Sequence, residues 1–182
     1  PDPVGLAGAV AARATPDGPL RPAWLAAQHF PGDIGIAVSV LLNHVRLGPG
    51  EAIYLGAGNV HAYLHGMGVE VMASSDNVLR CGLTPKHMDV EAVLGIADFS
   101  PLTEPRWAGA DGRFAVPVAD FALRAFDGAA PTTVDGPAIV LVTGGAVEVG
   151  EVPVQQGSAA YVCPRTPVPV RGPGQAFLAT AG

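Results

Sequence analysis

The chain has 182 residues, of which 49% are hydrophobic and only 14% are charged, so it is too apolar and too weakly charged for a disordered protein. Ten basic residues against sixteen acidic ones give a net charge of −6 with no basic stripe, which excludes a general nucleic-acid surface or an anionic-membrane surface. At roughly 150 residues per domain, this length allows one large domain or two small ones. The 24 glycines and 18 prolines favour short strands joined by turns.

The sequence shows neither a membrane-spanning segment nor a secretory signal. Its longest apolar stretch, residues 34–42, is too short to cross a bilayer. Cys81 and Cys163 imply no disulfide framework, so we expect a cytoplasmic protein with no membrane partner. The chain begins with Pro1 rather than Met, which suggests a piece of a longer protein.

The Ala-rich N-terminal segment predicts two helices, over residues 4–14 and 22–28, followed by a turn at residues 30–33. Residues 36–47 predict either a strand or a passage from helix to strand, and their periodicity does not decide between the two. Short strands and then a short helix are expected beyond this point, the strands at residues 52–55, 61–64 and 69–73 and the helix at residues 89–95.

A linker rich in Pro and Gly at residues 100–113 precedes a series of β-patterned runs. Turn residues separate these runs at short, fairly regular intervals, which is typical of an all-β sandwich or barrel. The predicted strands cover residues 114–118, 121–126, 138–143, 146–149, 157–163, 168–171 and 176–180.

A weak internal repeat aligns residues 50–63 with residues 157–170 at a constant offset. It predicts two related β-sandwich modules, although any two β-turn-β units can resemble each other this much. In this alignment Val168 stands opposite His61, so the second module would lack a metal ligand that the first has.

Residues 58–86 hold most of the groups that could carry chemistry. His61 and Tyr63 alternate along a predicted strand and should face the same side, and the next strand can bring the Glu70 carboxylate near them. One pocket could then hold a metal ligand, an acid/base group and two cationic side chains, Arg80 and Lys86, suited to an anionic substrate such as a sugar phosphate. The loop after Glu70 supplies the remaining candidates, Asp76, Arg80 and Lys86, the last being the only lysine.

Each of these residues also has an ordinary structural interpretation. A histidine entering a strand is more often a packed or surface residue than a ligand, and Glu70 alternates with two valines as on a solvent-facing strand. A catalytic zinc needs about three protein ligands plus an open position. The sequence offers no second histidine at convincing spacing, and we interpret three others as non-functional, namely His29, His44 and His87.

Seven short motifs within residues 31–86 strongly resemble the type I phosphomannose isomerases, also called mannose-6-phosphate isomerases. The motifs are Pro-Gly-Asp (31–33), Leu-Asn-His (42–44), Pro-Gly-Glu-Ala (49–52), His-Ala-Tyr (61–63), Glu-Val-Met-Ala (70–73), Ser-Asp-Asn-Val-Leu-Arg (75–80) and Gly-Leu-Thr-Pro-Lys (82–86). The resemblance covers about residues 30–99, and the β-rich remainder is similar to the C-terminal cupin-like domain of the same family.

The resemblance implies a mainly β fold, in which part of a cupin-type β-sandwich (jelly roll) precedes a second cupin-like β-sandwich, with short helices near the N-terminus. It also implies the domain boundaries. Residues 1–32 would be a helical segment and linker, residues 33–100 the C-terminal part of the zinc-binding cupin domain, residues 101–115 a linker, and residues 116–182 a metal-free cupin-like domain.

The enzymes of this family are zinc-dependent and interconvert mannose 6-phosphate and fructose 6-phosphate by enediol proton transfer. The resemblance implies that His61 is a zinc ligand and that Arg80 is the active-site arginine. Glu70, slightly preferred, and Asp76 would be the candidate bases. Lys86 and Tyr63 would bind the phosphorylated hexose.

The resemblance also implies that three of the four expected zinc ligands, a Gln-x-His pair and a Glu, are absent from this chain. We therefore expect the C-terminal part of an isomerase that holds one zinc ion when intact, inactive without the missing N-terminal part of the same protein. The alternative is a non-catalytic cupin-like module that binds a sugar phosphate or regulates, its metal ligands lost by evolution. A different cupin metalloenzyme, such as an oxygenase, would need more metal ligands than are present.

Overall fold

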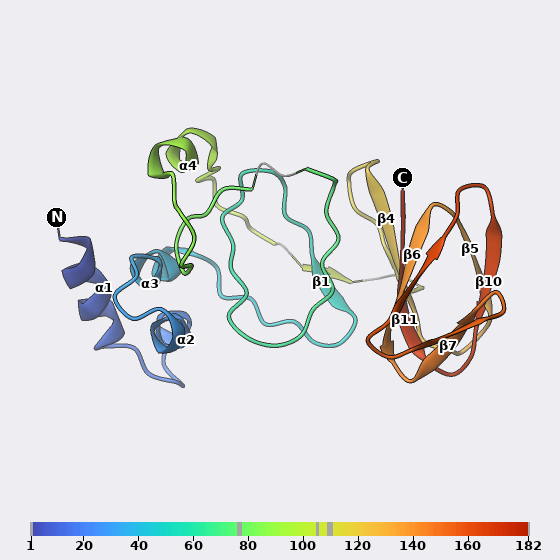
Figure 1. Cartoon of the computed structure of the whole chain (residues 1–182). Coiled ribbons are helices and arrows are strands. Elements are labelled where there is room, and N and C mark those ends of the chain that lie inside the picture. The colour runs from blue at the N-terminus through green and yellow to red at the C-terminus, as the bar shows by residue number, and fades with distance from the viewer. Residues whose placement is uncertain (1, 76–77, 105, 109–110, 182) are drawn as a thin grey trace. The chain divides into compact units, whose positions relative to one another are not determined.

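A computed structural model describes residues 2–75, 78–104, 106–108 and 111–181 of the chain. The chain divides into two compact units, each described here by itself (Figure 1). The helical unit comprises Pro1–Arg46, Leu55–Met67 and Ser75–Glu104. The sandwich unit comprises Leu47–Tyr54, Gly68–Ser74 and Pro105–Gly182.

Short helices packed on small side chains form the first part of the helical unit. Asp2 caps the first helix, because its Oδ1 accepts a hydrogen bond of 3.1 Å from the backbone N–H of Val4. Alanine side chains and Ile36 form the buried core of these helices. The helices are α1 (Pro3–Ala11), α2 (Arg21–His29), α3 (Gly35–Val38) and the 3-10 helix η1 (Ser39–Leu41).

The two helices predicted at residues 4–14 and 22–28 are thus confirmed, and residues 36–47 begin as helix. The short helix expected at residues 89–95 is present as α4 (Val90–Ile96). Within the described part of the chain, no helix combines the length and the apolar character needed to cross a membrane.

The strands predicted at residues 61–64 and 69–73 are wrong, since neither segment forms a strand. Figure 1 draws this part of the chain as a plain tube between β1 (Glu51–Ile53) and α4. Alternation in a sequence indicates which side chains would be covered, but a strand also requires a neighbour with which to form a ladder. Among the residues the structure describes, these two segments join no such ladder.

The sandwich unit contains a two-stranded ribbon and two larger antiparallel sheets. In the ribbon, β1 pairs with β2 (Arg106–Ala108), and the rings of Tyr54 and Trp107 meet edge to face with centroids 6.2 Å apart. The four-stranded sheet has the order β5-β10-β7-β8 and the five-stranded sheet the order β3-β4-β11-β6-β9. Their strands are β3 (Arg113–Phe114), β4 (Phe121–Phe126), β5 (Thr132–Asp135), β6 (Ala138–Gly144), β7 (Ala146–Val149), β8 (Val152–Gln155), β9 (Ala159–Val162), β10 (Pro167–Arg171) and β11 (Gln175–Ala181).

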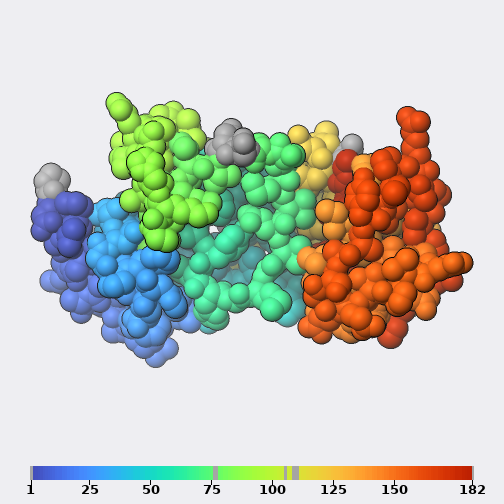
Figure 2. All heavy atoms as spheres, viewed as in Figure 1, coloured from blue at the N-terminus to red at the C-terminus, as the bar shows by residue number. Residues whose placement is uncertain are grey.

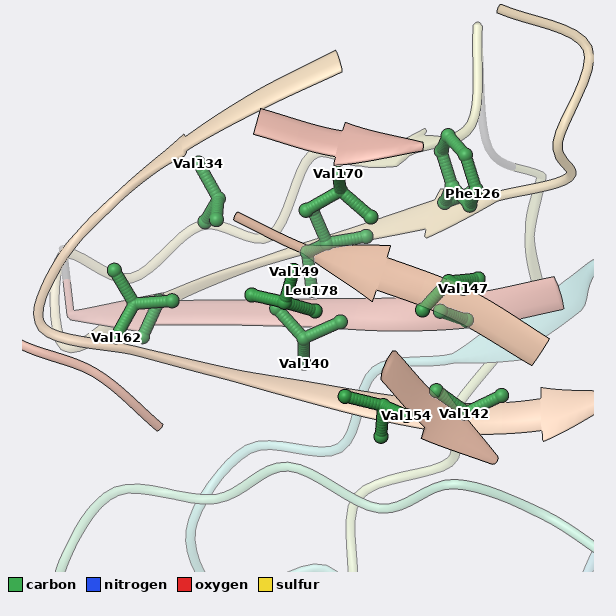
Figure 3. Packing of buried hydrophobic residues seen from close by; sticks show 12 residues of the cluster. Phe126, Val134, Val140, Val142, Val147, Val149, Val154, Val162, Val170 and Leu178 are labelled. Atoms are coloured by element: carbon green, nitrogen blue, oxygen red, sulfur yellow. The ribbon is translucent and has the colours of Figure 1, made fainter. Parts of the chain in front are cut away.

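A valine-rich core lies between the two larger sheets (Figure 3). Along β6 the side chains of Ala138, Val140 and Val142 are buried, whereas Ile139, between the first two, is 51% exposed, as the two-residue period of a strand requires. Valine suits these positions because its branched side chain packs well on a pleated surface. This core and its antiparallel strands confirm the mainly β prediction.

Four strands differ from the predictions for the C-terminal part. β5 and β8 were not predicted, and β8 carries Pro153, a residue that is unfavourable inside a sheet. Proline is tolerated in β8 because that strand lies at the edge of its sheet. β2 lies inside the stretch expected to be a linker, and β3 covers only the start of the strand predicted at residues 114–118.

Shortening Val140 should destabilise the sandwich unit, because its side chain is fully buried in the core. Val140→Ala is expected to lower the free energy of unfolding by about 2 kcal/mol, from lost burial and the cavity left behind. Val152→Ala is the matched control, since Val152 is 58% exposed. This substitution should lower the free energy of unfolding by less than about 0.5 kcal/mol. Urea denaturation followed by circular dichroism measures both, and equal losses would contradict the assigned core.

Candidate functional site

A short loop that ends at Asn59 positions His61. The side-chain Oδ1 of Asn59 accepts a hydrogen bond of 3.1 Å from the backbone N–H of Gly56. The backbone N–H of Asn59 donates to the carbonyl of Gly56 at 3.3 Å. On the other side, Asn59 forms an isolated parallel bridge with Asp98, whose N–H donates to the carbonyl of Gly58 at 2.9 Å. The loop is therefore held by its own turn and by the chain just after α4.

The imidazole of His61 is exposed and oriented by the backbone. Its Nδ1 lies 3.0 Å from the carbonyl oxygen of Asn59. A carbonyl oxygen only accepts hydrogen bonds, so Nδ1 carries the proton and donates it. In the neutral ring this leaves the lone pair of Nε2 available, which is the arrangement that metal-binding histidines commonly have.

The ring of Tyr63 lies beside that of His61. The two ring centroids are 6.0 Å apart, and the planes meet at 78°. The side-by-side placement expected from their alternation is therefore present, although the strand predicted to carry both residues is not. Tyr63 is 72% exposed, so its ring forms an accessible apolar wall next to the imidazole.

Arg80 and Lys86 lie on one loop that is anchored at its middle. Leu83 packs against the core of α1–α3, although its backbone has a left-handed φ of 52°, which costs roughly 1–2 kcal/mol. Gly82, with φ +146°, lies so close to the helices that an added Cβ would be 3.1 Å from both the Oδ1 of Asp33 and the Cα of Gly35. These contacts fix the middle of the loop.

Beyond the anchored middle, the two cationic side chains are exposed. The loop tightens before Lys86, whose backbone N–H donates a hydrogen bond of 3.1 Å to the Oγ1 of Thr84. An arginine and a lysine held on one short loop can contact an anionic ligand such as a phosphate.

Of the two candidate carboxylates, the structure describes only Glu70. Glu70 is exposed and belongs to the segment Gly68–Ser74 of the sandwich unit, whereas His61, Arg80 and Lys86 belong to the helical unit. Its neighbours Val69 and Val71 are half-buried, so the predicted alternation of side chains is present without a strand. Asp76 lies outside the described residues.

Among the described residues, no three His, Cys, Asp or Glu side chains are grouped so that they could hold a metal ion. His61 can supply one ligand, and its free Nε2 fits that role. His44 lies elsewhere in the helical unit, where burial and then the positive charges of Arg21 and Arg46 lower its pKa.

Asn59, whose carbonyl orients His61, was not predicted from the sequence. The only local signal was the Gly-Asn pair at residues 58–59, which is typical of a turn and says nothing about a carbonyl that contacts an imidazole.

Adding a side chain at Gly58 should loosen the loop before His61. Gly58 has φ +81°, and a Cβ there would lie 2.7 Å from the carbonyl oxygen of Ile96. Gly58→Ala is expected to lower the free energy of unfolding by roughly 1–2 kcal/mol because of the left-handed backbone, and by about 1–3 kcal/mol more because of this contact. Urea denaturation and hydrogen exchange of the α4 amides measure the effect.

Gly32→Ala is the control for that variant. Gly32 has the same φ of +81°, but nothing lies within 4 Å of its added Cβ, so only the backbone cost remains. Equal losses for the two variants would show that the contact with Ile96 does not hold the loop.

Comparisons with known proteins point to one family. No family model matches the chain. The chain is 46% identical over 106 residues to the mannose-6-phosphate isomerase of Salmonella typhimurium, which corresponds to 55% of this chain and 27% of that protein. It is 35% identical over 156 residues to the mannose-6-phosphate isomerase of Rattus norvegicus, or 74% of this chain and 37% of the relative.

Solved structures extend the similarity over nearly the whole chain. A mutant of phosphomannose isomerase from Salmonella typhimurium aligns with a TM-score of 0.80 and 30% identity, covering 98% of this chain and 49% of the solved one. A zinc-bound mannose 6-phosphate isomerase aligns with a TM-score of 0.79 over the same shares. The chain thus spans about half the length of the solved relatives and less of the curated relatives.

Proposed function

We propose that this chain, which is homologous to the mannose-6-phosphate isomerases, supplies one part of the active site of such an enzyme. The observation that carries the proposal is the hydrogen bond from His61 Nδ1 to the Asn59 carbonyl, which leaves Nε2 available to a metal. The proposed reaction interconverts mannose 6-phosphate and fructose 6-phosphate.

The proposed zinc site holds one ion, with His61 as a ligand. A bound zinc ion supplies Lewis-acid polarisation of substrate oxygens. One imidazole cannot hold zinc, since a catalytic site needs about three protein ligands. The remaining ligands would come from the part of the isomerases that this chain does not span, so we expect the chain alone to be inactive.

The reaction moves a proton between C1 and C2 of the sugar through an enediol. We propose Glu70 or Asp76 as the base, with Glu70 preferred, and a positioned base contributes roughly 10²–10⁴-fold. Arg80 would stabilise the negative charge that develops on the substrate oxygen. Lys86 would bind the phosphate group, and the ring of Tyr63 would line the pocket beside His61.

The test compares the chain alone with the chain combined with the missing part of the fold. That part is the segment of the Salmonella typhimurium isomerase left uncovered by the structural alignment, co-expressed or fused in front of this chain. We expect neither isomerase turnover nor stoichiometric zinc from the chain alone, and both from the combination. Turnover by the chain alone, or a zinc-free and inactive combination that is folded, would refute the proposal.

A further inference from the structure

The α4 surface, formed by Val90, Leu94, Ile96 and Phe99, is apolar and uncovered. These side chains are 62%, 63%, 60% and 71% exposed, and α4 buries none of its residues. In Figure 2 the yellow-green atoms of this part of the chain are uncovered on the face in view. A helix that is apolar around most of its circumference normally lies inside a protein.

α4 is nevertheless a well-anchored helix. At its start, the Oδ1 of Asp89 accepts a hydrogen bond of 3.0 Å from the N–H of Ala92. At its end, Ala97 donates to the carbonyl of Val93 at 2.9 Å, and Asp98 bridges to Asn59. The helix is therefore capped at both ends and tied to the chain near Asn59 just after its C-terminal end, while the exposed apolar side chains remain available to a partner.

We infer that the α4 surface docks the part of the isomerase fold that this chain does not span. The inference rests on the proposed function. The chain aligns over 98% of its length with a solved isomerase but covers only 49% of it, so the complete fold contains about as many residues again. A polypeptide of that size can cover an apolar helix as a core does, and burying the Val, Leu, Ile and Phe side chains of this surface would stabilise the contact.

The charges around the α4 surface favour this occupant over others. Asp89 and Glu91 flank it at one end and Asp98 at the other, and hydrogen bonds from Ser100 lower the pKa of the Asp98 carboxyl. An anionic lipid surface would be repelled by this acidic rim. A second copy of the chain would bring the same carboxylates to the contact and carries a net charge of −6.

The experiment co-expresses this chain with an affinity-tagged segment of the Salmonella typhimurium isomerase, the segment that the structural alignment leaves uncovered. We expect the tagged segment to capture the chain. The variant Val90→Glu/Leu94→Glu places two charges on the α4 surface, and we expect its capture to fall about tenfold or more. In the wild-type complex, hydrogen exchange of the amides of residues 90–99 should slow relative to the chain alone.

The control is Ile139→Glu/Val152→Glu, which places the same charges at sandwich positions of similar exposure, 51% and 58%. We expect it to be captured like the wild-type chain. Equal capture of both double variants, or unchanged exchange at residues 90–99, would overturn the inference. Two further results would overturn the inference: a dimer of the chain that the α4 variant abolishes, or binding of the chain to phosphatidylglycerol vesicles that the α4 variant abolishes.

Assaying the captured complex separates this inference from the proposed function. A complex that depends on the α4 surface but lacks isomerase activity would support the docking and refute the function. An active complex that forms equally well with the α4 variant would support the function and refute the docking.

Discussion

Replacing His61 by alanine is expected to remove zinc from the complex that we propose this chain forms with the missing part of the isomerase fold. The Nε2 of His61 is the only nitrogen of that ring free to bind a metal, since Nδ1 donates to the carbonyl of Asn59. Loss of one of about four ligands should lower bound zinc from about one ion per complex to a trace. Turnover should fall with it by roughly 10³-fold or more.

Metal analysis of the dialysed complex and a coupled isomerase assay measure both effects. His65→Ala is the matched control, because His65 is also an exposed histidine of the helical unit and has no proposed role. Its complex should keep zinc and activity. A His61→Ala complex with stoichiometric zinc would refute the assignment of His61 as a ligand.

Replacing Arg80 by alanine should slow the reaction while leaving zinc bound. The exposed guanidinium lies on the loop anchored by Leu83, and its proposed partner is the negative oxygen of the enediol-like intermediate. Removing one such electrostatic contact typically lowers kcat by roughly 10²–10³-fold. Because the partner charge develops only during the reaction, kcat should fall far more than KM rises.

Steady-state kinetics and metal analysis of the same complex test this expectation. Arg80→Lys should restore part of kcat, since it keeps the charge but loses the forked geometry of the guanidinium. Arg46→Ala is the control, because Arg46 is another exposed arginine of the helical unit without a proposed role. A near-normal kcat for Arg80→Ala would refute the role.

The sequence predicted the sandwich strands best where side chains alternate between two environments. β7 lies at the predicted residues, because its pattern already reflects burial on one face, and β4 also lies at the predicted residues although the burial of its side chains does not alternate strictly. β8 was not predicted because proline, here Pro153, is unfavourable inside a sheet. Proline is acceptable in β8 because this strand lies at the edge of its sheet. For residues 61–64 and 69–73 the error is the opposite one, a strand predicted where none forms. Their side chains alternate, but within the ranges that the structure describes neither segment has a neighbouring strand with which to pair.

The sequence could name candidate residues for the site, which remain a proposal, but not their geometry. The motifs identified His61, Arg80 and Lys86, and alternation correctly placed Tyr63 beside His61. The carbonyl that orients the imidazole could not be predicted, because its position depends on a contact with Asp98, far along the chain. Such long-range contacts are not encoded in local periodicity.

The bridge between Asn59 and Asp98 links the rigidity of α4 to the tautomer of the His61 imidazole. The strand-like contact that follows α4 involves Asn59, the residue whose carbonyl accepts the proton of His61 Nδ1. We therefore expect motion at the end of α4 to change how strongly one tautomer of the imidazole is preferred. A metal ligand with a fixed tautomer loses less conformational freedom when it binds, so a more rigid α4 should raise the metal affinity of His61.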